Sequence, residues 1–326
     1  MNQLQLVDYP DPHRARAARL RREHPELKRL QGPTWWTPPL TLGLVVVQVL
    51  LTAWVSSLAR SLAQPDAWGV WGWAVVPLLA FGVGAFISHA LYAVLHECTH
   101  LLAGRGRTVN RVVSLVANLP LVLPMAITYA HFHLLHHRHQ GEPALDPDLP
   151  GSAEHALAQR GALGKLAWHV SFPFWQLWRT RTMPQPRARG WLALNVVSQG
   201  VFCAAVALLV GVPGLVYLAL SLYFTIALHP LAGRLLQEHT VVHEQQETYS
   251  YYGALNAISL NVGYHSEHHD FPAVPWTRLP ALRRACAALY DDELVSHGSW
   301  SAVWWRFMTD ARLGPLARVV RHSRRE

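Results

Sequence analysis

The chain has 326 residues, of which 51% are hydrophobic and only 15% are charged. Soluble domains carry about 25% charged residues, so this balance excludes an ordinary soluble protein and indicates a membrane protein. The formal net charge is +8, but it does not call for nucleic-acid binding, because membrane proteins collect lysine and arginine on their cytoplasmic side. Cys98, Cys203 and Cys286 show no C-x-x-C spacing, so they predict neither a disulfide framework nor a thiolate metal site.

Residues 1–37 form a polar, basic segment without the apolar stretch that a secretory signal needs. Its basic residues are Arg14, Arg16, Arg19, Arg21, Arg22, Lys28 and Arg29. We interpret it as a cytoplasmic segment. It forms either a short amphipathic helix near lipid headgroups or a solvated basic face.

Residues 40–95 predict the first pair of membrane helices. The stretches 40–59 and 70–95 are apolar and uncharged, and each reaches the roughly 20 residues that a membrane-spanning helix needs. A helix over 70–95 would be about 39 Å long, which exceeds a hydrocarbon layer of about 30 Å. Its end therefore stands clear of the lipid and carries the first histidine pair, His96 and His100, into the cytoplasm.

Residues 112–130 are also uncharged and long enough to cross a membrane, but they contain Pro120 and Pro124. A crossing here would place the histidines before and after it on opposite sides of the membrane. We therefore expect a buried or re-entrant segment at the membrane surface.

The pattern H-x-x-H-H occurs at residues 133–137 and again at residues 265–269. With 20 histidines in 326 residues, chance would produce this pattern only about 0.07 times per chain. Residues at i, i+3 and i+4 share one face of a helix, so each motif can direct its three rings to one side. The pair at 96 and 100 has the same property.

Residues 191–212 and 215–231 predict a second pair of membrane helices, joined by a turn containing Pro213 and Gly214. Every lysine and arginine except Arg60 then lies on one side of a four-span arrangement. Positive residues mark the cytoplasmic side, so both termini and all three histidine motifs are assigned to the cytoplasm.

The predicted fold is an all-α, multi-pass integral membrane protein with four transmembrane helices. It forms one domain over residues 1–326, since no internal repeat or linker divides it. Residues 40–95 and 191–231 supply the two helix pairs. Residues 96–190 and 232–326 form a helical cytoplasmic cap that holds the histidine motifs.

Eight histidines lie in the three motifs, which exceeds what one four-coordinate ion can bind and indicates two metal ions. They are His96, His100, His133, His136, His137, His265, His268 and His269. Neutral imidazole suits zinc, copper, iron and nickel, and the absence of paired thiolates disfavours structural zinc. Other polar residues could support the ligands by holding their ring N–H groups, with a solvated charge as the alternative for each carboxylate. These candidates are His89, Glu97, Asp146, Asp148, His229, Glu238, Asn261, Glu267 and Asp270.

The motifs resemble those of the membrane fatty acid desaturase and hydroxylase superfamily. A narrower resemblance, to the sphingolipid delta(4)-desaturases (dihydroceramide desaturases), lies in two stretches near the third motif. They are Glu247-Thr248-Tyr249-Ser250-Tyr251-Tyr252-Gly253 and Asn261-Val262-Gly263-Tyr264-His265-Ser266-Glu267-His268-His269-Asp270-Phe271-Pro272. Residues 25–33, 146–148, 229–233 and 238–239 are similar to the same family, so the resemblance covers nearly the whole chain. Three positions depart from the family pattern: Arg234 stands where it has a histidine, and Leu101 and Ser266 stand where it has an asparagine.

The resemblance implies a histidine-bound di-iron centre that uses O2 to attack an unactivated C–H bond. It implies the eight motif histidines as ligands and one further histidine, for which His239 fits best and His229 second. The implied reaction places a double bond in the sphingoid chain of a dihydroceramide-like lipid. Hydroxylation of the same lipid at C4 and a fatty acyl or carotenoid substrate stay open. The Ala- and Arg-rich composition favours a bacterial member, in the inner membrane.

Each turnover would need two electrons, and the chain contains neither a dinucleotide-binding G-x-G-x-x-G after a strand nor a haem-attachment C-x-x-C-H. We therefore expect an external donor such as a ferredoxin or a cytochrome b5-like protein. The alternative from another class is a membrane metal transporter or sensor. Such a protein should carry ionisable groups along a path within its spans, where only His89 and His229 lie.

Overall fold

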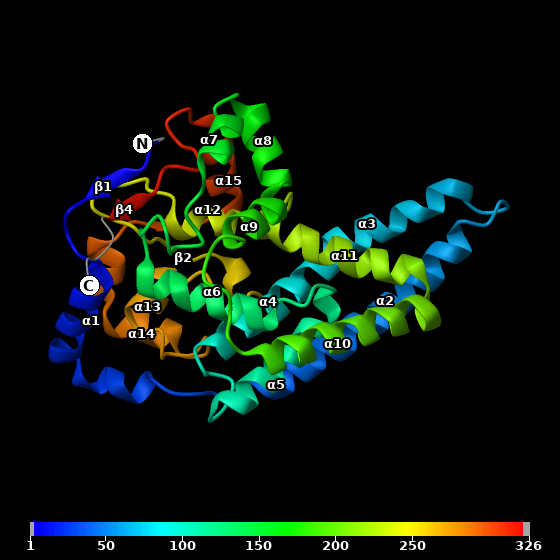
Figure 1. The fold of residues 1–326 in the computed structure, drawn as a ribbon, viewed down its shortest axis with the longest axis horizontal. Coiled ribbons are helices and arrows are strands. Elements are labelled where there is room, and N and C mark those ends of the chain that lie inside the picture. The colour runs from blue at the N-terminus through cyan, green and yellow to red at the C-terminus, as the bar shows by residue number, and fades with distance from the viewer. Residues whose placement is uncertain (1–2, 322–326) are drawn as a thin grey trace. The chain divides into compact units, whose positions relative to one another are not determined.

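The computed structural model describes residues 3–321, and helices make up most of its regular structure (Figure 1). Contacts within the chain divide it into two units. The first contains the described part of residues 1–33, 131–185 and 226–326, and the second contains residues 34–130 and 186–225. Each unit has its own hydrophobic core.

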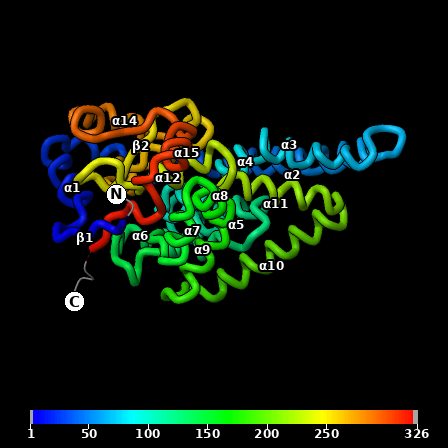
Figure 2. The backbone as a smooth tube through the Cα atoms, turned by 90° about the horizontal axis from the view of Figure 1, so that it is seen from above, coloured from blue at the N-terminus to red at the C-terminus, as the bar shows by residue number. Residues whose placement is uncertain are grey.

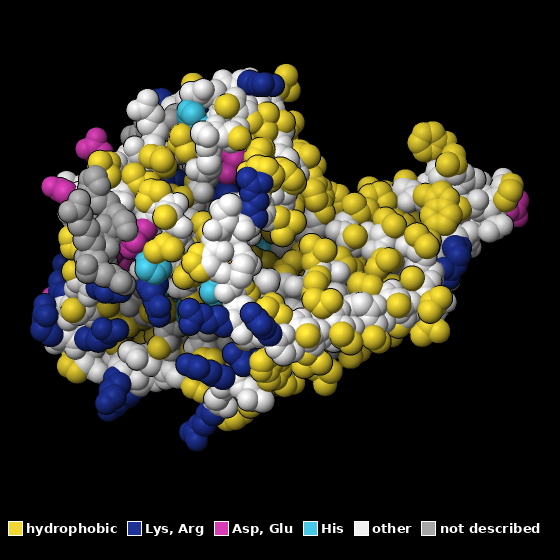
Figure 3. Space-filling view, viewed as in Figure 1, with side chains coloured by type: hydrophobic (Ala, Val, Ile, Leu, Met, Phe, Trp, Pro, Cys, Tyr) yellow, Lys and Arg dark blue, Asp and Glu magenta, His cyan; other side chains and the backbone are white. Residues whose placement is uncertain are grey.

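The second unit consists of apolar helices. They are α2 (Thr37–Leu62), η2 (Gly69–Ala74), α3 (Val75–Leu79), a π-helical turn η3 (Ala80–Gly84), α4 (Ala85–Thr99), α5 (Arg107–Asn118), η4 (Leu119–Leu121), α10 (Arg189–Ala205), a second π-helical turn η5 (Val206–Val210) and most of α11 (Val212–Ile226). Figure 2 shows α2 beside α3 and α4. Val55, Val76, Val206 and Tyr217 are buried in the core of this unit, while hydrophobic side chains cover the visible outer surface of α2 and α10 (Figure 3).

Within residues 3–321, three helical stretches are long and apolar enough to cross a membrane. They are Thr37–Leu62, Gly69–Thr99 and Arg189–Val210. Two bent pairs also qualify when each is taken together: Val212–Ile226 with Pro230–His239, bent by 43°, and Arg107–Leu121 with Ala126–His139, bent by 112°. The prediction of a helical membrane protein with several apolar helices is confirmed.

The sharp bend between α5 and α6 (Ala126–His139) lies where the sequence has Pro120 and Pro124. Proline removes a backbone donor and interrupts a helix. Asn118 holds the bend: its Nδ2 donates to the Leu123 carbonyl at 2.7 Å, and its Oδ1 accepts from the Ala126 amide at 2.8 Å. The Asn195 side chain donates to the same oxygen at 3.0 Å, which ties the bend to α10.

The first unit contains shorter helices. They are α1 (Pro12–Glu23), η1 (Pro25–Leu30), the end of α6, α7 (Ser152–Ala158), α8 (Ala162–Val170), α9 (Phe172–Thr180), η6 (Pro230–Ala232), α12 (Gly233–His239), η7 (Ala254–Asn256), α13 (His265–Asp270), α14 (Leu279–Ala285), a π-helical turn η8 (Ala288–Glu293) and α15 (Trp300–Thr309). Two small parallel sheets accompany them. Strand β1 (Gln5–Val7) pairs with β4 (Val319–Arg321), and β2 (Ser250–Tyr251) pairs with β3 (Ser296–His297). The first sheet fixes segments near the two ends of the chain to each other.

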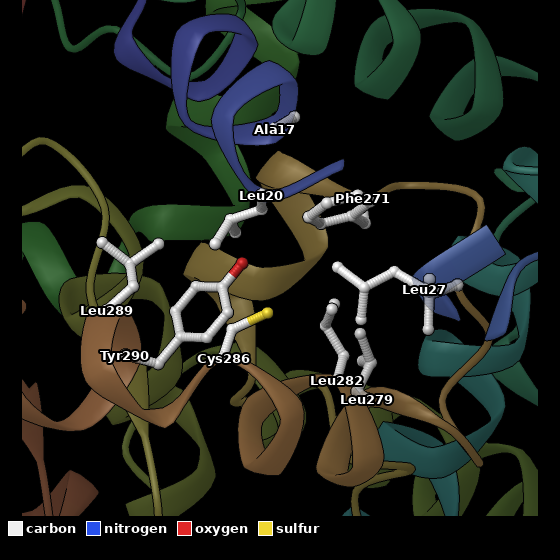
Figure 4. Close-up of a cluster of buried hydrophobic side chains, with 10 residues drawn as sticks. Ala17, Leu20, Leu27, Phe271, Leu279, Leu282, Cys286, Leu289 and Tyr290 are labelled. Atoms are coloured by element: carbon white, nitrogen blue, oxygen red, sulfur yellow. The ribbon is translucent and has the colours of Figure 1, made fainter. Parts of the chain in front are cut away.

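Two apolar clusters stabilise the first unit. One contains Trp168, Phe172 and Phe307, from α8, α9 and α15. The other joins α1 to α13 and α14, and its central side chains point toward one another in Figure 4. They are Ala17, Leu20, Leu27, Phe271, Leu279, Leu282, Cys286, Leu289 and Tyr290.

Candidate metal centre

Helix α6 carries the second histidine motif near its carboxyl end. His133, His136 and His137 occupy positions i, i+3 and i+4, so their rings lie on one side of the helix. The ring centroids of His133 and His137 are 4.6 Å apart. The helical spacing predicted from the sequence is therefore present.

The third motif lies on α13, a helix of only six residues, all of them buried. A helix this short is not stable by itself in water, so its position depends on contacts with other segments. His265, His268 and His269 all lie on it. The ring centroids of His265 and His269 are 4.4 Å apart.

Helix α12 ends at His239 and brings a seventh histidine to these six. The helix packs closely on α15, because a side chain at Gly233 would collide with the backbone carbonyl of Trp300. The Trp300 indole also donates to Gln237 Oε1 at 2.9 Å. These contacts fix the end of α12 at which His239 lies.

His239 is the centre of one group of ring nitrogens. Its Nε2 lies 3.0 Å from His136 Nε2 and 2.9 Å from His265 Nε2. A neutral imidazole nitrogen carries either one hydrogen or one lone pair, so hydrogen bonding cannot satisfy both contacts. A metal ion can, since two nitrogens bound cis to one ion at about 2.1 Å lie about 3 Å apart.

His137 is the centre of a second group with the same geometry. Its Nε2 lies 3.0 Å from His133 Nε2 and 3.0 Å from His268 Nε2. The possible ligand atoms of these three residues are all within 4.8 Å of one another. The first unit therefore contains two groups of converging nitrogens, as a centre with two metal ions requires.

His269 lies between the two groups. Its ring stacks on His137 with centroids 4.3 Å apart, and its possible ligand atom is within 4.8 Å of those of His136 and His239. Burial lowers the pKa of His269 well below its usual value, and the neighbouring histidines lower it further. The ring is therefore neutral at pH 7, the form that binds a metal ion. Its Nε2 is buried without a hydrogen-bond partner among residues 3–321, and a bound ion would satisfy this nitrogen.

Asp146 supports the group around His239. Its Oδ1 accepts a hydrogen bond from His136 Nδ1 at 2.8 Å. Burial opposes protonation of His136, but Asp146 and Asp148 raise its pKa to about 9. A metal ion would therefore displace the proton on Nε2, the nitrogen that faces His239, while Asp146 keeps the proton on Nδ1. Burial opposes ionisation of Asp146, but His136 and the backbone amides of Gly141 and Asp148 outweigh it and lower the pKa of Asp146. The Asp148 carboxylate is more distant, 3.6 Å from His136 Nδ1.

Two further carboxylates lie near His265. Glu238 Oε1 is 3.7 Å from His265 Nδ1 and also forms an ion pair with Arg234, one helical turn away. Glu267 accepts hydrogen bonds from the hydroxyls of Ser250, at 2.5 Å, and Tyr252, at 2.6 Å. Burial raises the pKa of Glu267 to about 7 although both hydroxyls oppose this shift.

His96 and His100 belong to the second unit. His96 lies in the last turn of α4 and His100 directly follows that helix, with ring centroids 5.1 Å apart. The two rings therefore lie on one face, as their spacing predicts. His89 and Glu97 are buried on the same helix.

Two of the predicted supporting residues make local backbone contacts. His229 Nδ1 accepts from the Leu231 amide at 3.2 Å and caps η6. Asn261 has a left-handed backbone with φ of 51°, and its side chain donates to the Trp276 carbonyl at 2.9 Å. Within residues 3–321, His229 is not part of either group of nitrogens around His137 and His239.

The sequence analysis did not identify the residues that bind Asp270. Its carboxylate accepts hydrogen bonds from His13, Arg16 and Tyr290. The one sequence signal for this contact was the spacing of His13, Arg16, Ala17 and Leu20 along α1. This spacing gives the basic helix one face that can be buried.

Comparison with known proteins agrees with this site. Residues 71–301 match the family model for fatty acid desaturases, and the chain therefore belongs to the fatty acid desaturase family. Among its relatives, it is 37% identical to the sphingolipid delta(4)-desaturase of Drosophila melanogaster, over 96% of this chain and 94% of the relative.

Two other relatives carry related names. The chain is 37% identical to a sphingolipid delta(4)-desaturase-like protein of Oryza sativa subsp. japonica, over 96% of this chain and 91% of the relative. It is 36% identical to a sphingolipid delta(4)-desaturase/C4-monooxygenase of Homo sapiens, over 95% of this chain and 92% of the relative. The predicted resemblance to sphingolipid delta(4)-desaturases is confirmed.

Proposed function

We propose that this protein is an O2-dependent di-iron desaturase that introduces a delta-4 double bond into the sphingoid chain of a dihydroceramide-like lipid. The observation that carries the proposal is the pair of nitrogen groups centred on His137 and His239. The names of the relatives support the lipid substrate and the position of the double bond.

Nine histidines would hold the two iron ions. They are His96, His100, His133, His136, His137, His239, His265, His268 and His269. Bound iron would supply the activation of molecular oxygen that removal of hydrogen from a methylene group requires.

The protein's own residues would keep the site ready for metal. Asp146 holds the proton of His136 on Nδ1, so that Nε2 is free to bind an ion. Glu238 and Glu267 would partly balance the positive charge of two ions held by neutral ligands. The buried rings of His136, His239, His265, His268 and His269 would limit the access of water, which strengthens electrostatic interactions within the site.

In the membrane we propose four spans, with both termini and the active site cytoplasmic, in the inner membrane of a bacterium. The bent pair of α5 and α6 would be re-entrant, and its 112° bend supports this arrangement. Residues 96–190 and 232–326 would form one cap over the spans. An external donor, such as a ferredoxin or a cytochrome b5-like protein, would supply electrons at the basic cytoplasmic surface.

Hydroxylation at C4 of the same lipid is the second candidate. Relatives from Homo sapiens and Rattus norvegicus carry names that combine delta(4)-desaturase with C4-monooxygenase. Both reactions begin with removal of hydrogen from the same chain. They differ in whether a second hydrogen leaves or a hydroxyl group is added.

The test is to express the protein in cells that are supplied with dihydroceramide and an electron donor, and to analyse the lipids by mass spectrometry. Desaturation lowers the mass by about 2 units and hydroxylation raises it by about 16, because of the atoms exchanged. His268→Ala should abolish both products, and His131→Ala, on α6 but outside the motif, should retain them. Iron-loaded protein that leaves dihydroceramide unchanged would refute the proposed substrate.

A further inference from the structure

The carboxylate of Asp270 is the centre of a buried network. Asp270 ends α13 and directly follows His268 and His269. Its side chain has no solvent exposure. A buried carboxylate is costly unless it is paired and hydrogen-bonded.

Two residues of α1 form most of the hydrogen bonds to the Asp270 carboxylate, although they lie more than 250 positions earlier in the sequence. His13 Nδ1 is 2.6 Å from Asp270 Oδ1. Arg16 donates from Nε to Asp270 Oδ2 at 3.1 Å and from Nη2 to Oδ1 at 2.9 Å. Tyr290 adds a hydrogen bond from its hydroxyl to Oδ2 at 3.0 Å.

The direction of the bond between His13 and Asp270 follows from the chemistry of both groups. An ionised carboxylate can only accept, so His13 Nδ1 carries the hydrogen and donates it. Arg16 Nη2 also lies 2.8 Å from His13 Nδ1, but a guanidinium can only donate, and it donates to Asp270. The imidazole and the guanidinium therefore bind the same carboxylate side by side.

The His13 ring also lies beside a histidine of the proposed metal centre, His269. Its centroid is 4.8 Å from that of His269, with the rings inclined by 40°. Ala17 and Leu20, on the same face of α1, pack in one cluster with Phe271. Helix α1 is thus fixed to α13 by apolar contacts on one side of Asp270 and by the contact of His13 with His269 on the other.

We propose that His13 and Arg16 are positioning residues of the metal centre. By holding Asp270 they set the orientation of α13 and the plane of the His269 ring. The role given to His13 rests on the proposed metal site, and it extends that site to a helix outside the three histidine motifs. Among the described residues His13 belongs to neither group of converging nitrogens, so its role in this arrangement is to position the site and not to bind metal.

The test uses three substitutions of His13 in the full-length protein. The amide nitrogen of asparagine can take the place of Nδ1, whereas that of glutamine takes the place of Nε2. We expect His13→Leu and His13→Gln to weaken iron binding about 10-fold. This is the lower end of the 10- to 100-fold range for a direct hydrogen-bond partner of a metal ligand, because Asp270 is not itself a ligand. Both substitutions should also change the Mössbauer spectrum of bound iron. His13→Asn should bind iron within about threefold of the wild type, because the hydrogen bond to Asp270 is kept.

Amide hydrogen exchange of the iron-free protein supplies a readout that is independent of metal. In His13→Leu, exchange should become about tenfold faster at 265–270 and stay unchanged at 133–137, since, within residues 3–321, α1 packs against α13 and not against α6. Faster exchange with native iron binding and an unchanged spectrum would overturn the positioning role and leave a purely structural one. Rescue by glutamine in place of asparagine would also overturn it.

Two arginines of α1 provide a matched comparison. Arg16→Gln removes the guanidinium from the buried carboxylate and should reproduce the effects of His13→Leu. Arg19→Gln removes an exposed ion pair with Glu293 and should change neither iron binding nor exchange. Equal behaviour of the two variants would overturn the inference. A wild-type protein that binds no iron would overturn the proposed function and this inference with it, whereas iron binding unaffected by His13→Leu would overturn this inference alone.

Discussion

The motif H-x-x-H-H occurs on two helices of this protein, α6 and α13, and the two helices are stabilised in different ways. On α6 it lies at the end of a helix of 14 residues, whose backbone hydrogen bonds can hold the spacing of the rings. On α13 it occupies a helix of six buried residues. There, Ser266, Glu267 and Asp270 bond to side chains from other segments, so tertiary contacts replace helix length.

This difference teaches that the spacing of a motif and the orientation of its helix are separate requirements. Spacing comes from the sequence of five residues in both cases. Orientation comes from a regular helix in one case and from a hydrogen-bond network in the other. Substitutions can therefore remove a ligand, weaken its hydrogen-bond partner or loosen its helix, with effects of different size.

Removing a ligand should have the largest effect on iron binding, and the effect should be the same for a ligand on α6 and for one on α13. His137→Ala on α6 and His268→Ala on α13 each delete one nitrogen of the same group. Loss of an outer partner weakens metal binding by about 10- to 100-fold, so loss of a ligand should cost more than about 100-fold. Iron content and product formation measure this. Retention of iron by either variant would show that the residue is not a ligand.

A smaller effect should follow when the partner of a ligand on α6 is changed. Asp146→Asn keeps the shape of the side chain but removes the charge that holds the proton on His136 Nδ1. We expect iron to bind about 10- to 100-fold more weakly. A titration with iron measures the change, and an unaltered dissociation constant would mean that Asp146 does not support His136.

The network around α13 predicts a dependence of stability on pH. The pKa of Glu267 in the folded protein is about 7, above its ordinary value of 4.5. The folded state therefore holds a proton that the unfolded state releases, and this group stabilises the fold less as pH rises from 4.5 to about 7. Melting temperatures of iron-free wild type and Glu267→Gln should diverge with pH in this range. Parallel curves would refute the raised pKa.

The parts of this site that the sequence predicted are those encoded by local spacing. Residues at i, i+3 and i+4 in the motifs, the apolar stretches and the break at Pro120 and Pro124 are visible within a few neighbouring residues. The contact between His13 and Asp270 is not, because it joins positions 257 residues apart. His239 was predicted only in part. The family resemblance indicated it as a ligand, but its short distance to His136 is visible only in the fold.

Arg234 shows why a departure from a family pattern needs the structure. The pattern has a histidine there, and the sequence analysis assigned the arginine no partner, although Glu238 lies four residues later. In the fold, Arg234 forms an ion pair with Glu238, whose carboxylate also lies near His265. The substitution therefore places a positive charge beside the carboxylate nearest to that ring.

Substitution of Asp148, the matched control for Asp146, should have the smallest effect on iron binding. Both carboxylates follow α6 and approach the same nitrogen of His136. The Asp148 oxygen is 3.6 Å from it, beyond hydrogen-bond distance, and its side chain is 39% exposed, so water screens its charge. We expect Asp148→Asn to change the dissociation constant for iron by less than about fivefold, since an exposed ion pair contributes about 0–1 kcal/mol. If it weakened iron binding as much as Asp146→Asn, net negative charge near His136, and not the direct hydrogen bond, would be what supports the ligand on α6.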